Sequence, residues 1–182
     1  MKVVLLAAIS FVFAIGPARV DVQQKAVDLA SHPIRKLDFL VGEWEGSGWI
    51  QLGPTQRRTY RQHESIRYAA GGTVLVVEGL GRNSDAGPDQ GKVVHDAFAV
   101  ASFDRAKKAY LWRAFTANDD AVDTVLDIDE AEIRWGIETP QGKTRFRLRI
   151  DRSGEWIESG EFSPDGKSWS QFLEMKLKKK AN

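Results

Sequence analysis

The 182-residue sequence contains no cysteine. This absence excludes disulfide bonds, thiol-based catalysis and the cysteine-ligated zinc sites of many small domains. Histidine is scarce as well, and His32, His63 and His95 share no metal-ligand spacing. His63 and His95 each precede an acidic residue, but adjacent residues of a strand point to opposite faces, so each pair offers only one ligand to the interior. We therefore expect no bound metal and no other cofactor.

Recognisable catalytic motifs and any excess of charge are also missing. No glycine-rich phosphate loop precedes a helix, and no Gly-x-Ser-x-Gly nucleophile elbow occurs. The chain has 26 basic and 25 acidic residues. Nucleic acid and anionic membranes attract proteins with a surplus of positive charge, so this balance argues against either as the main partner.

The only long apolar run is at the start of the chain. Lys2 is followed by an apolar segment from Val3 to Ile15 and by the small residues of Gly16-Pro17-Ala18. This pattern predicts a secretory signal peptide over residues 1–18, because the run is too short to span a bilayer comfortably. The alternative is an uncleaved N-terminal anchor. We expect the protein to be periplasmic or secreted, without stable membrane insertion once the signal is removed, and residues 19–31 to form a linker or a marginal helix.

The remainder of the chain alternates between strand-like segments and turns. Nine clusters of turn-forming residues follow the first strand. They are Gly53–Pro54, Gly71–Gly72, Asn83–Gly91, Asp104–Lys107, Asn118–Asp120, Asp129–Glu130, Pro140–Gly142, Ser153–Gly154 and Pro164–Gly166. Nine breaks predict about ten strands, spaced closely enough to be joined as hairpins. Residues 32–180 should therefore form an all-β, antiparallel, up-and-down barrel, because closure removes the exposed sheet edges.

The segment from Phe39 to Ile50 predicts how one end of this barrel is closed. Ser31-His32-Pro33 can begin a short amphipathic helix that leads into it, with His32 exposed near the helix start. By the two-residue period of a strand, Trp44, Gly46 and Gly48 share one face. The large ring would plug the floor, and the glycines would allow a sharp bend and leave space inside.

Polar residues lie on faces that are otherwise apolar. Glu64, Glu78 beside Val76 and Leu80, and Glu158 beside Trp156 all have the parity expected for the interior. A carboxylate in a packed core is costly unless it is paired. Either the interior is partly wet and holds a ligand, or these residues lie near the barrel mouth and reach water. The alternating Arg145, Arg147 and Arg149 are expected to form a solvated outer face, because acidic residues on neighbouring strands can face them.

Two stretches carry a resemblance to known families. The opening from Leu37 to Gly48, with its Gly42-Glu43-Trp44 motif, resembles the Gly-x-Trp entry of calycin barrels, the superfamily of lipocalins and fatty-acid-binding proteins. The ending from Trp156 to Trp169 resembles an exported, lipocalin-like bacterial domain family of unknown function. The opening is also similar to nitrobindin-type haem barrels, whose iron is held by a histidine late in the chain. No histidine follows His95, so we do not expect haem to be the natural ligand.

The resemblance and the inward polar residues together predict a non-catalytic, ten-stranded calycin-like barrel that binds a small, largely apolar ligand. Aromatic walls with a few polar anchors suit such ligands. The candidate ligand-binding residues are Trp44, Tyr60, Glu64, Tyr68, Glu78, Trp112, Trp156, Glu158 and Trp169. Two alternatives remain: an isomerase or hydrolase that uses the inward carboxylates, and a structural or interaction barrel of the cell envelope. A cavity with a strongly perturbed glutamate would favour the enzyme, and a packed interior would favour the structural role.

Overall fold

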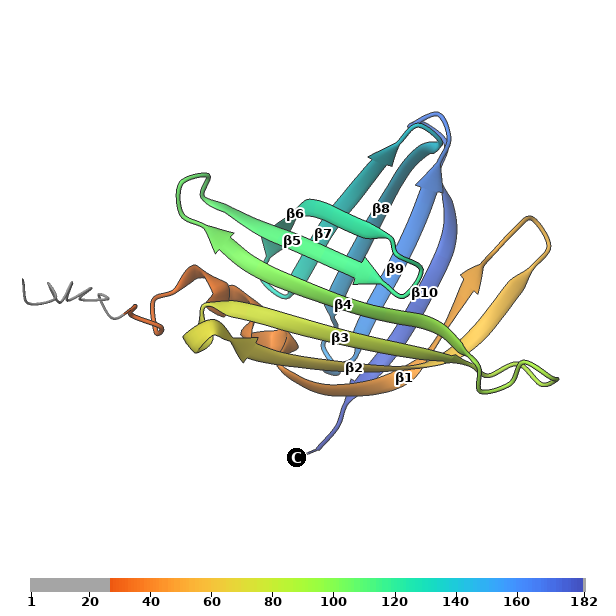
Figure 1. Ribbon diagram of the computed structural model, residues 1–182, viewed down its shortest axis with the longest axis horizontal. Coiled ribbons are helices and arrows are strands. Elements are labelled where there is room, and N and C mark those ends of the chain that lie inside the picture. Colours follow the sequence, from red (N-terminus) through yellow and green to blue (C-terminus); the bar gives the residue numbers. More distant parts are fainter. Residues whose placement is uncertain (1–26, 182) are drawn as a thin grey trace, which may run out of the picture.

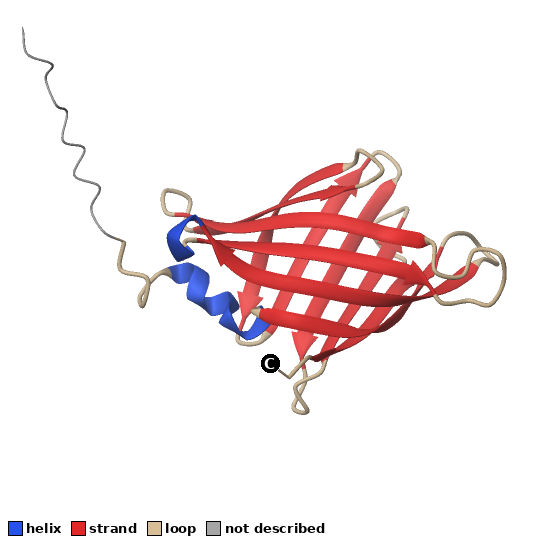
Figure 2. Ribbon diagram, turned by 60° about the horizontal axis from the view of Figure 1, so that its bottom comes forward, coloured by secondary structure: helices blue, strands red, loops and turns tan. Residues whose placement is uncertain are grey.

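A computed structural model describes residues 27–181, which form ten antiparallel strands in one closed barrel (Figures 1 and 2). The strands are β1 (Gly42–Gln51), β2 (Arg57–Ala69), β3 (Val74–Asn83), β4 (Val93–Asp104), β5 (Ala109–Thr116), β6 (Ala121–Asp129), β7 (Glu132–Thr139), β8 (Gly142–Ile150), β9 (Trp156–Ser163) and β10 (Ser170–Lys179). Each strand pairs with its neighbours in the sequence, and β1 closes the barrel against β10. The predicted up-and-down barrel is confirmed, whereas the predicted signal peptide and most of the linker lie outside the described residues.

All nine predicted breaks separate consecutive strands, and their side chains explain why. The carboxylate of Asp104 accepts hydrogen bonds from the backbone N–H groups of Ala106 and Lys107, at 2.9 and 3.0 Å. Asp165 does the same for Lys167 and Ser168, each at 2.8 Å. Such bonds satisfy backbone donors where the strand ladder stops. Turns at these positions fix the hairpin order and hence the barrel topology.

A 3₁₀ helix, η1 (Pro33–Leu40), covers one end of the barrel, and a second, η2 (Ala70–Gly72), joins β2 to β3. The prediction that His32 is exposed was wrong: it is 6% exposed, and its Nδ1 accepts a hydrogen bond from the Ile34 N–H at 3.3 Å as the N-cap of η1. The Tyr110 hydroxyl in β5 donates to the Pro33 carbonyl at 2.9 Å, which ties η1 to the barrel wall. Within residues 27–181, no helix has the length and apolar character needed to cross a membrane.

The end beneath η1 is tightly packed around Trp44. Its ring is 1% exposed and meets Trp156 edge to face, with the ring centroids 5.5 Å apart. Its indole N–H donates to the Leu40 carbonyl at 2.7 Å, so the one polar atom of the ring is satisfied. A Cβ atom at Gly46 would collide with the β10 backbone, and one at Gly48 would lie 2.7 Å from the Tyr60 ring. The glycines therefore allow close approach of β10 and Tyr60 to β1, as the sequence pattern indicates.

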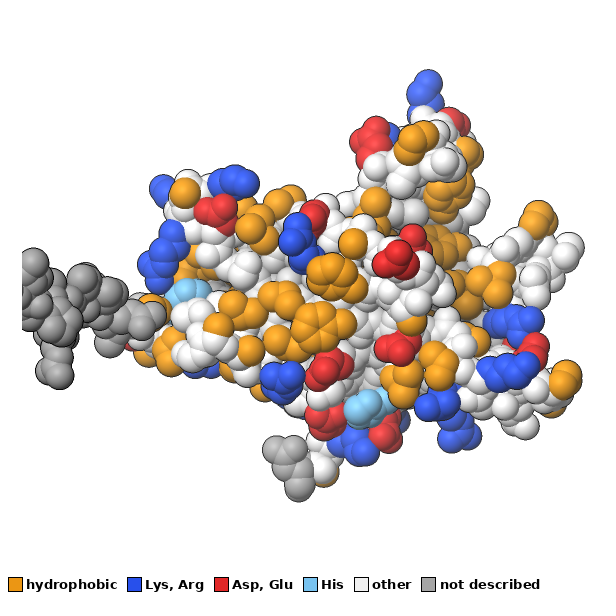
Figure 3. All heavy atoms as spheres, in the orientation of Figure 1, with side chains coloured by type: hydrophobic (Ala, Val, Ile, Leu, Met, Phe, Trp, Pro, Cys, Tyr) orange, Lys and Arg blue, Asp and Glu red, His pale blue; other side chains and the backbone are white. Residues whose placement is uncertain are grey.

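Strands β6, β7 and β8 follow the predicted alternation. Leu126, Ile133 and Leu148 are buried, and the arginines between the apolar positions of β7 and β8 face solvent. Arg145 is paired with Glu161 across the outer face, at 2.6 Å. Apolar side chains also reach the outer surface, where they gather over β3 and β4 (Figure 3). The outer face is thus mixed in character, and the apolar core lies inside the barrel.

The pairing between β6 and β7 is the shortest of the ten. It covers only Asp127–Asp129 against Glu132–Arg134, whereas β1 pairs along its whole length with β2. Farther along this seam, the Thr124 hydroxyl donates to the Gly136 carbonyl at 2.9 Å. A side-chain bond therefore crosses the part of the seam where the regular ladder is not formed.

Candidate ligand-binding cavity

The barrel encloses a cavity of about 270 Å³ between the packed end and the loops at the opposite end. Leu37 and Leu40 of η1 form part of its floor, and residues from all ten strands complete its walls. Most of the lining is apolar. The aliphatic and alanine residues are Leu37, Leu40, Ile50, Leu75, Val77, Val94, Ala97, Ala99, Ala114, Val122, Leu126, Ile133, Ile137, Leu148, Leu173 and Met175, and the aromatic ones are Tyr60, Trp112, Trp135, Phe146 and Trp156. An enclosed apolar cavity with few polar groups is the usual form of a small-molecule site.

The polar groups of the cavity come mainly from β2 and β9. Glu64 and Gln62 are 5% and 3% exposed, and the Gln62 side-chain N–H donates to Glu64 Oε1 at 2.7 Å. Glu158 also lines the cavity, and it accepts a hydrogen bond from the Trp156 indole N–H at 3.2 Å. Gln62 Oε1 is buried and has no partner among the described residues. The cavity therefore contains two carboxyl groups and an amide oxygen whose capacity to accept hydrogen bonds is only partly used.

Burial strongly changes the protonation of these groups. Loss of water raises the pKa of Glu64 to about 7, although the bond from Gln62 opposes the shift. Burial, together with the charge on Glu64, raises the pKa of Glu158 to about 8. Burial raises the pKa of Tyr60 as well, and the carboxylates of Glu158 and Glu64 add to that shift. Near neutral pH, the two carboxyl groups can thus be partly protonated and can act as donors or acceptors.

Glycines on β3 make room for this polar cluster. A Cβ atom at Gly79 would lie 2.6 Å from Glu64 Oε1, and one at Gly81 would lie 2.5 Å from Gln62 Oε1. Both distances are far below ordinary van der Waals contact, so the absence of a side chain here lets the two polar groups lie against the β3 backbone. The Gly81 position also faces His95 on the neighbouring strand.

His95 and Thr116 mark the side of the cavity nearest the open end. His95 as a whole is exposed, yet atoms packed around its ring lower its pKa, and Asp96 partly offsets this effect. Thr116 Oγ1 is buried without a partner among residues 27–181. The predicted loop from Asn83 to Gly91 lies at this same end and projects away from the barrel (Figure 1). The mouth is therefore polar, in contrast with the apolar floor.

The structure brings together five of the nine candidate residues: Tyr60, Glu64, Trp112, Trp156 and Glu158 all line the cavity. Trp44 lies beneath it in the packed end and packs against Trp156, which lines the cavity. Tyr68 lies outside it, where its hydroxyl bonds Asp38 and the Arg35 guanidinium stacks 4.4 Å from its ring centroid. These two residues support the floor and do not line the site.

The inward orientation predicted for Glu78 was wrong. Its side chain is 50% exposed and faces Arg67 on the outer surface, with 3.6 Å between charged atoms. Val74–Val77 is apolar on both faces, so alternation alone could not decide which face is internal. The inward positions are those of Leu75, Val77 and the two glycines, which the sequence pattern did not mark as part of a site.

Trp169 also lies on the outer side, where the Arg145 guanidinium stacks on its ring at 4.1 Å. A β-bulge between Gln171 and Leu173 inserts one extra residue into β10. Because side chains alternate with a period of two, the bulge reverses the parity of every residue that precedes it. The prediction that Trp169 faces inward with Leu173 was wrong for this reason.

Sequence reasoning missed Gln62, His95, Trp135 and Phe146 as members of the site. Trp135 and Phe146 stack with ring centroids 5.1 Å apart, and Trp112 lies 6.3 Å from Trp135. By the two-residue period of a strand, Gln62 shares a face with Glu64, Trp135 with Ile133, and Phe146 with Leu148. This period is the only sequence signal for the three residues. The convergence of the four missed residues depends on the register of β2, β4, β7 and β8, which a single sequence does not fix.

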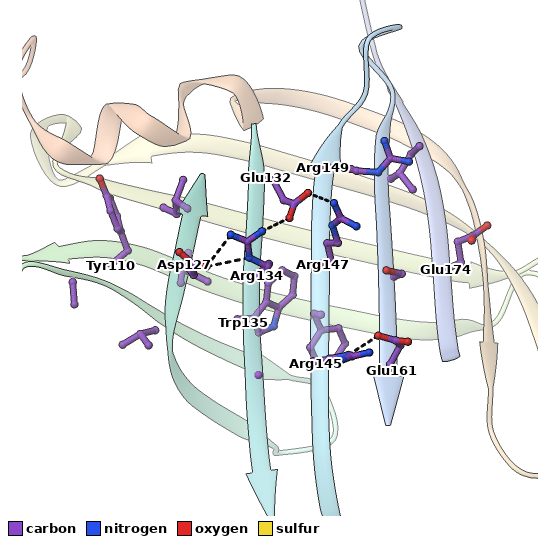
Figure 4. A pocket seen from close by; sticks show the side chains of 18 of the residues that line it. Tyr110, Asp127, Glu132, Arg134, Trp135, Arg145, Arg147, Arg149, Glu161 and Glu174 are labelled. Carbon is purple, nitrogen blue, oxygen red and sulfur yellow. Dashed lines mark hydrogen bonds and ion pairs between the residues drawn. The ribbon is translucent and has the colours of Figure 1, made fainter. Parts of the chain in front are cut away.

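A second, larger hollow of about 1350 Å³ lies on the outer surface of β6–β10 (Figure 4). Its charged side chains largely neutralise one another. Arg134 pairs with Asp127 and Glu132, and Arg147 pairs with Glu132. Arg134, Arg147 and Asp127 are exposed to solvent, and the hollow is open, so water weakens the attraction of these groups for a charged ligand. We take the smaller, enclosed cavity as the candidate site.

The two hollows adjoin at the seam between β6 and β7. Both hollows are lined by Leu126, Trp135 and Phe146. These side chains therefore lie between the cavity and the outer surface at this point.

Neither the described side chains nor their arrangement provides an evident metal centre. Within residues 27–181, no three His, Asp or Glu side chains are grouped closely enough to hold a metal ion. His63 is on the outer face, where its Nε2 lies 2.8 Å from Glu43 Oε2. His95 is at the mouth, so the two histidines do not share a site.

Comparison with known proteins supports the fold. The chain is similar to the crystal structure of Rv2717c from M. tuberculosis, with a TM-score of 0.59, 16% identity, and coverage of 81% of this chain and 97% of that one. It is also similar to the S-type phycobiliprotein lyase CPES from Guillardia theta, with a TM-score of 0.54, 7% identity, and coverage of 80% and 92%. The fold is a calycin-like barrel. No family model and no curated protein matches the sequence, so the likeness extends to the fold alone.

Proposed function

We propose that the protein binds a small, largely apolar molecule with a polar end inside the barrel. The observation that carries this proposal is the cavity inside the barrel, which is lined by aromatic and aliphatic side chains and by the incompletely satisfied Gln62, Glu64 and Glu158. At roughly 30 Å³ for each water-sized group, a cavity of about 270 Å³ accommodates on the order of ten non-hydrogen atoms. A ligand of this size would place its apolar body against the floor and its polar end at the carboxyl groups.

The test is binding of a bicyclic probe, 1-naphthol, to purified protein that has been stripped of any co-purified molecule. We expect a one-to-one complex by calorimetry and quenching of tryptophan emission, because Trp112, Trp135 and Trp156 line the cavity. Ala114→Phe fills the cavity and should abolish binding. Ala121→Phe adds the same ring at an exposed position of β6 and should not. Absence of binding by the folded wild-type protein, or equal binding by both variants, would count against a carrier function.

An acid–base enzyme is the second candidate, and the raised pKa values of Glu64 and Glu158 specifically favour it. A neighbour of the same fold is named a phycobiliprotein lyase, which supports the idea that such a barrel can serve an enzyme. If the two glutamates exchange protons with a carbon acid, ligands incubated with the protein in heavy water should gain deuterium, as measured by mass spectrometry. Glu64→Gln and Glu158→Gln should abolish the exchange. The structural-barrel alternative would be supported by a packed interior, which the cavity does not provide.

We further propose that the barrel acts in the periplasm or outside the cell. The support is in the sequence alone, where Lys2 and the apolar run from Val3 to Ile15 resemble a secretory signal. Fractionation of the native host, followed by N-terminal mass spectrometry, should recover a chain that begins near Arg19 in the soluble exported fraction. Recovery of intact Met1 with the membranes would contradict the proposal.

A further inference from the structure

The charged groups of the cavity are of one sign. Glu64 and Glu158 line it, and neither Lys nor Arg is found among its lining residues. The other titratable groups in the lining are Tyr60 from β2 and His95 from β4. Lys179 reaches toward the barrel from β10, but its ammonium lies over the Trp44 ring at the packed end, 5.3 Å from the centroid. No Lys or Arg side chain of the described lining is thus available to neutralise either carboxylate.

The same groups have unused acceptors. Among the described residues, Glu64 accepts one hydrogen bond from Gln62, and Glu158 accepts one from Trp156. An ionised carboxylate has room for about four such bonds, and it donates none. Gln62 Oε1 adds a buried acceptor without a partner. The polar end of the cavity therefore suits a ligand group that is rich in donors, and an anionic group would add a further negative charge beside the two carboxyl groups.

Aromatic rings line the same cavity as these acceptors. Tyr60, Trp112, Trp135, Phe146 and Trp156 all contribute to the walls. The face of an aromatic ring carries negative electrostatic potential, which attracts organic cations and is strongest for tryptophan. Both the aromatic rings and the carboxylates therefore favour a positively charged, donor-rich ligand group.

We infer that the ligand is a small organic cation, a protonated amine on an aromatic or aliphatic body, whose ammonium group binds at Glu64 and Glu158. This inference rests on the proposed ligand-binding function and specifies the chemical class of the ligand. An ammonium group has three donors and no acceptor, which complements the unused acceptors of the site. Its positive charge also pairs with the two carboxylates, for which the lining offers no Lys or Arg partner. Because the cation favours their ionised forms, binding near neutral pH releases protons.

A matched ligand series tests the inference: 2-phenylethylamine, 2-phenylethanol and 3-phenylpropanoate, titrated calorimetrically at pH 8.5. The three share a phenyl body and carry a positive, a neutral and a negative end. We expect the amine to bind at least tenfold more tightly than the alcohol, and the carboxylate to bind most weakly. If the alcohol or the carboxylate binds as well as the amine, or if 1-naphthol binds and the amine does not, the inference fails while the binding function stands. If neither the series nor 1-naphthol binds, both fail.

Variants separate charge recognition from folding. Glu64→Gln and Glu158→Gln keep the shape of each side chain and should lower affinity for the amine at least tenfold, while affinity for the alcohol changes less than threefold. Glu78→Gln, on the exposed outer face, is the matched control and should alter neither. Circular dichroism and thermal melting establish that each variant is folded. Equal losses for amine and alcohol would assign the glutamates a structural role and overturn the inference.

The pH dependence gives an independent measurement. Between pH 8.5 and pH 6, we expect affinity of the wild-type protein for the amine to fall at least tenfold, because both carboxyl groups become protonated. The measured heat should also vary with the ionisation enthalpy of the buffer, which reports proton release. The Glu64→Gln/Glu158→Gln double variant should show neither effect. An affinity for the amine that is independent of pH would contradict direct pairing with these carboxylates.

Discussion

The two ends of this barrel are built from the same strands but differ in how their polar atoms are treated. At the packed end, Trp44 contacts Trp156, and its indole N–H is bonded to Leu40. In the cavity, buried oxygens of Gln62 and Thr116 have no partner within the described residues. Satisfied polar groups and close packing stabilise a fold, whereas unpaired groups beside an empty volume reduce its stability. The contrast indicates that the packed end maintains the barrel and that the other half is available for binding.

The largest expected effect on stability comes from removing one ring at the packed end and, for comparison, one ring from the cavity wall. Trp44→Ala should lower the free energy of unfolding by about 3–5 kcal/mol, because a buried ring and its contacts are lost. Trp112→Ala should cost about half as much or less, because one side of that ring already faces the cavity and lacks packing partners. Urea denaturation measures both values. Equal costs would mean that the two ends contribute alike to stability.

The pH dependence of unfolding should show how far the buried carboxyl groups destabilise the folded protein without a ligand. Glu64 and Glu158 have pKa values raised to about 7 and 8 in the folded state, against 4.5 for an ordinary glutamate. The folded state therefore binds protons more tightly, and stability declines as pH rises from about 5 to 8.5. At about 1.4 kcal/mol for each pKa unit, we expect a loss of several kcal/mol to which both glutamates contribute, Glu158 at the higher pH.

The Glu64→Gln/Glu158→Gln double variant is the reference for this measurement, and its stability should change less over the same range. Asp165, whose pKa backbone bonds lower to about 2, loses its contribution only in stronger acid and does not affect this window. The lowered pKa of His95 acts in the opposite direction, because stability from that residue increases as pH rises. If the free energy of unfolding varies with pH in the same way for the wild-type and double-variant proteins, ionisation of the two glutamates does not destabilise the fold.

A pair of glycine substitutions gives a smaller and more selective contrast. Gly46→Ala should destabilise the protein by about 3 kcal/mol, because the new methyl group meets the backbone of β10, which cannot move aside. Gly79→Ala meets only the carboxylate end of Glu64, so we expect about 1 kcal/mol of destabilisation. The second change should instead alter ligand affinity, since it displaces Glu64 within the cavity. Denaturant titration measures the stability of both variants, and calorimetry measures their ligand affinity. A larger loss of stability for Gly79→Ala than for Gly46→Ala would contradict the prediction.

Much of the fold could be predicted because its signals are local. Turn residues at nine places gave the strand order, and β6 to β8 alternate clearly between apolar and charged residues. The site was harder to predict from the sequence, because a cavity depends on which strand faces meet across the barrel. Glu64 and Glu158 were predicted to face inward from parity, but their mutual effect on ionisation depends on the register that brings β2 and β9 together.

The failures at Glu78 and Trp169 have different physical origins. Around Glu78, both faces of β3 are apolar, so the two-residue period contains too little information to choose between them. At Trp169, the period is clear but a bulge shifts it. A bulge depends on how neighbouring strands accommodate one extra residue, and its position is not evident from alternation within one strand.

The short ladder between β6 and β7 has a consequence for kinetics. Few backbone hydrogen bonds must break for these strands to separate, and the cavity lies directly behind them. We therefore expect their amides at this seam to exchange with deuterium sooner than those of β1 and β2. If the cavity binds a ligand as proposed, the residence time of that ligand should depend on how often this seam opens.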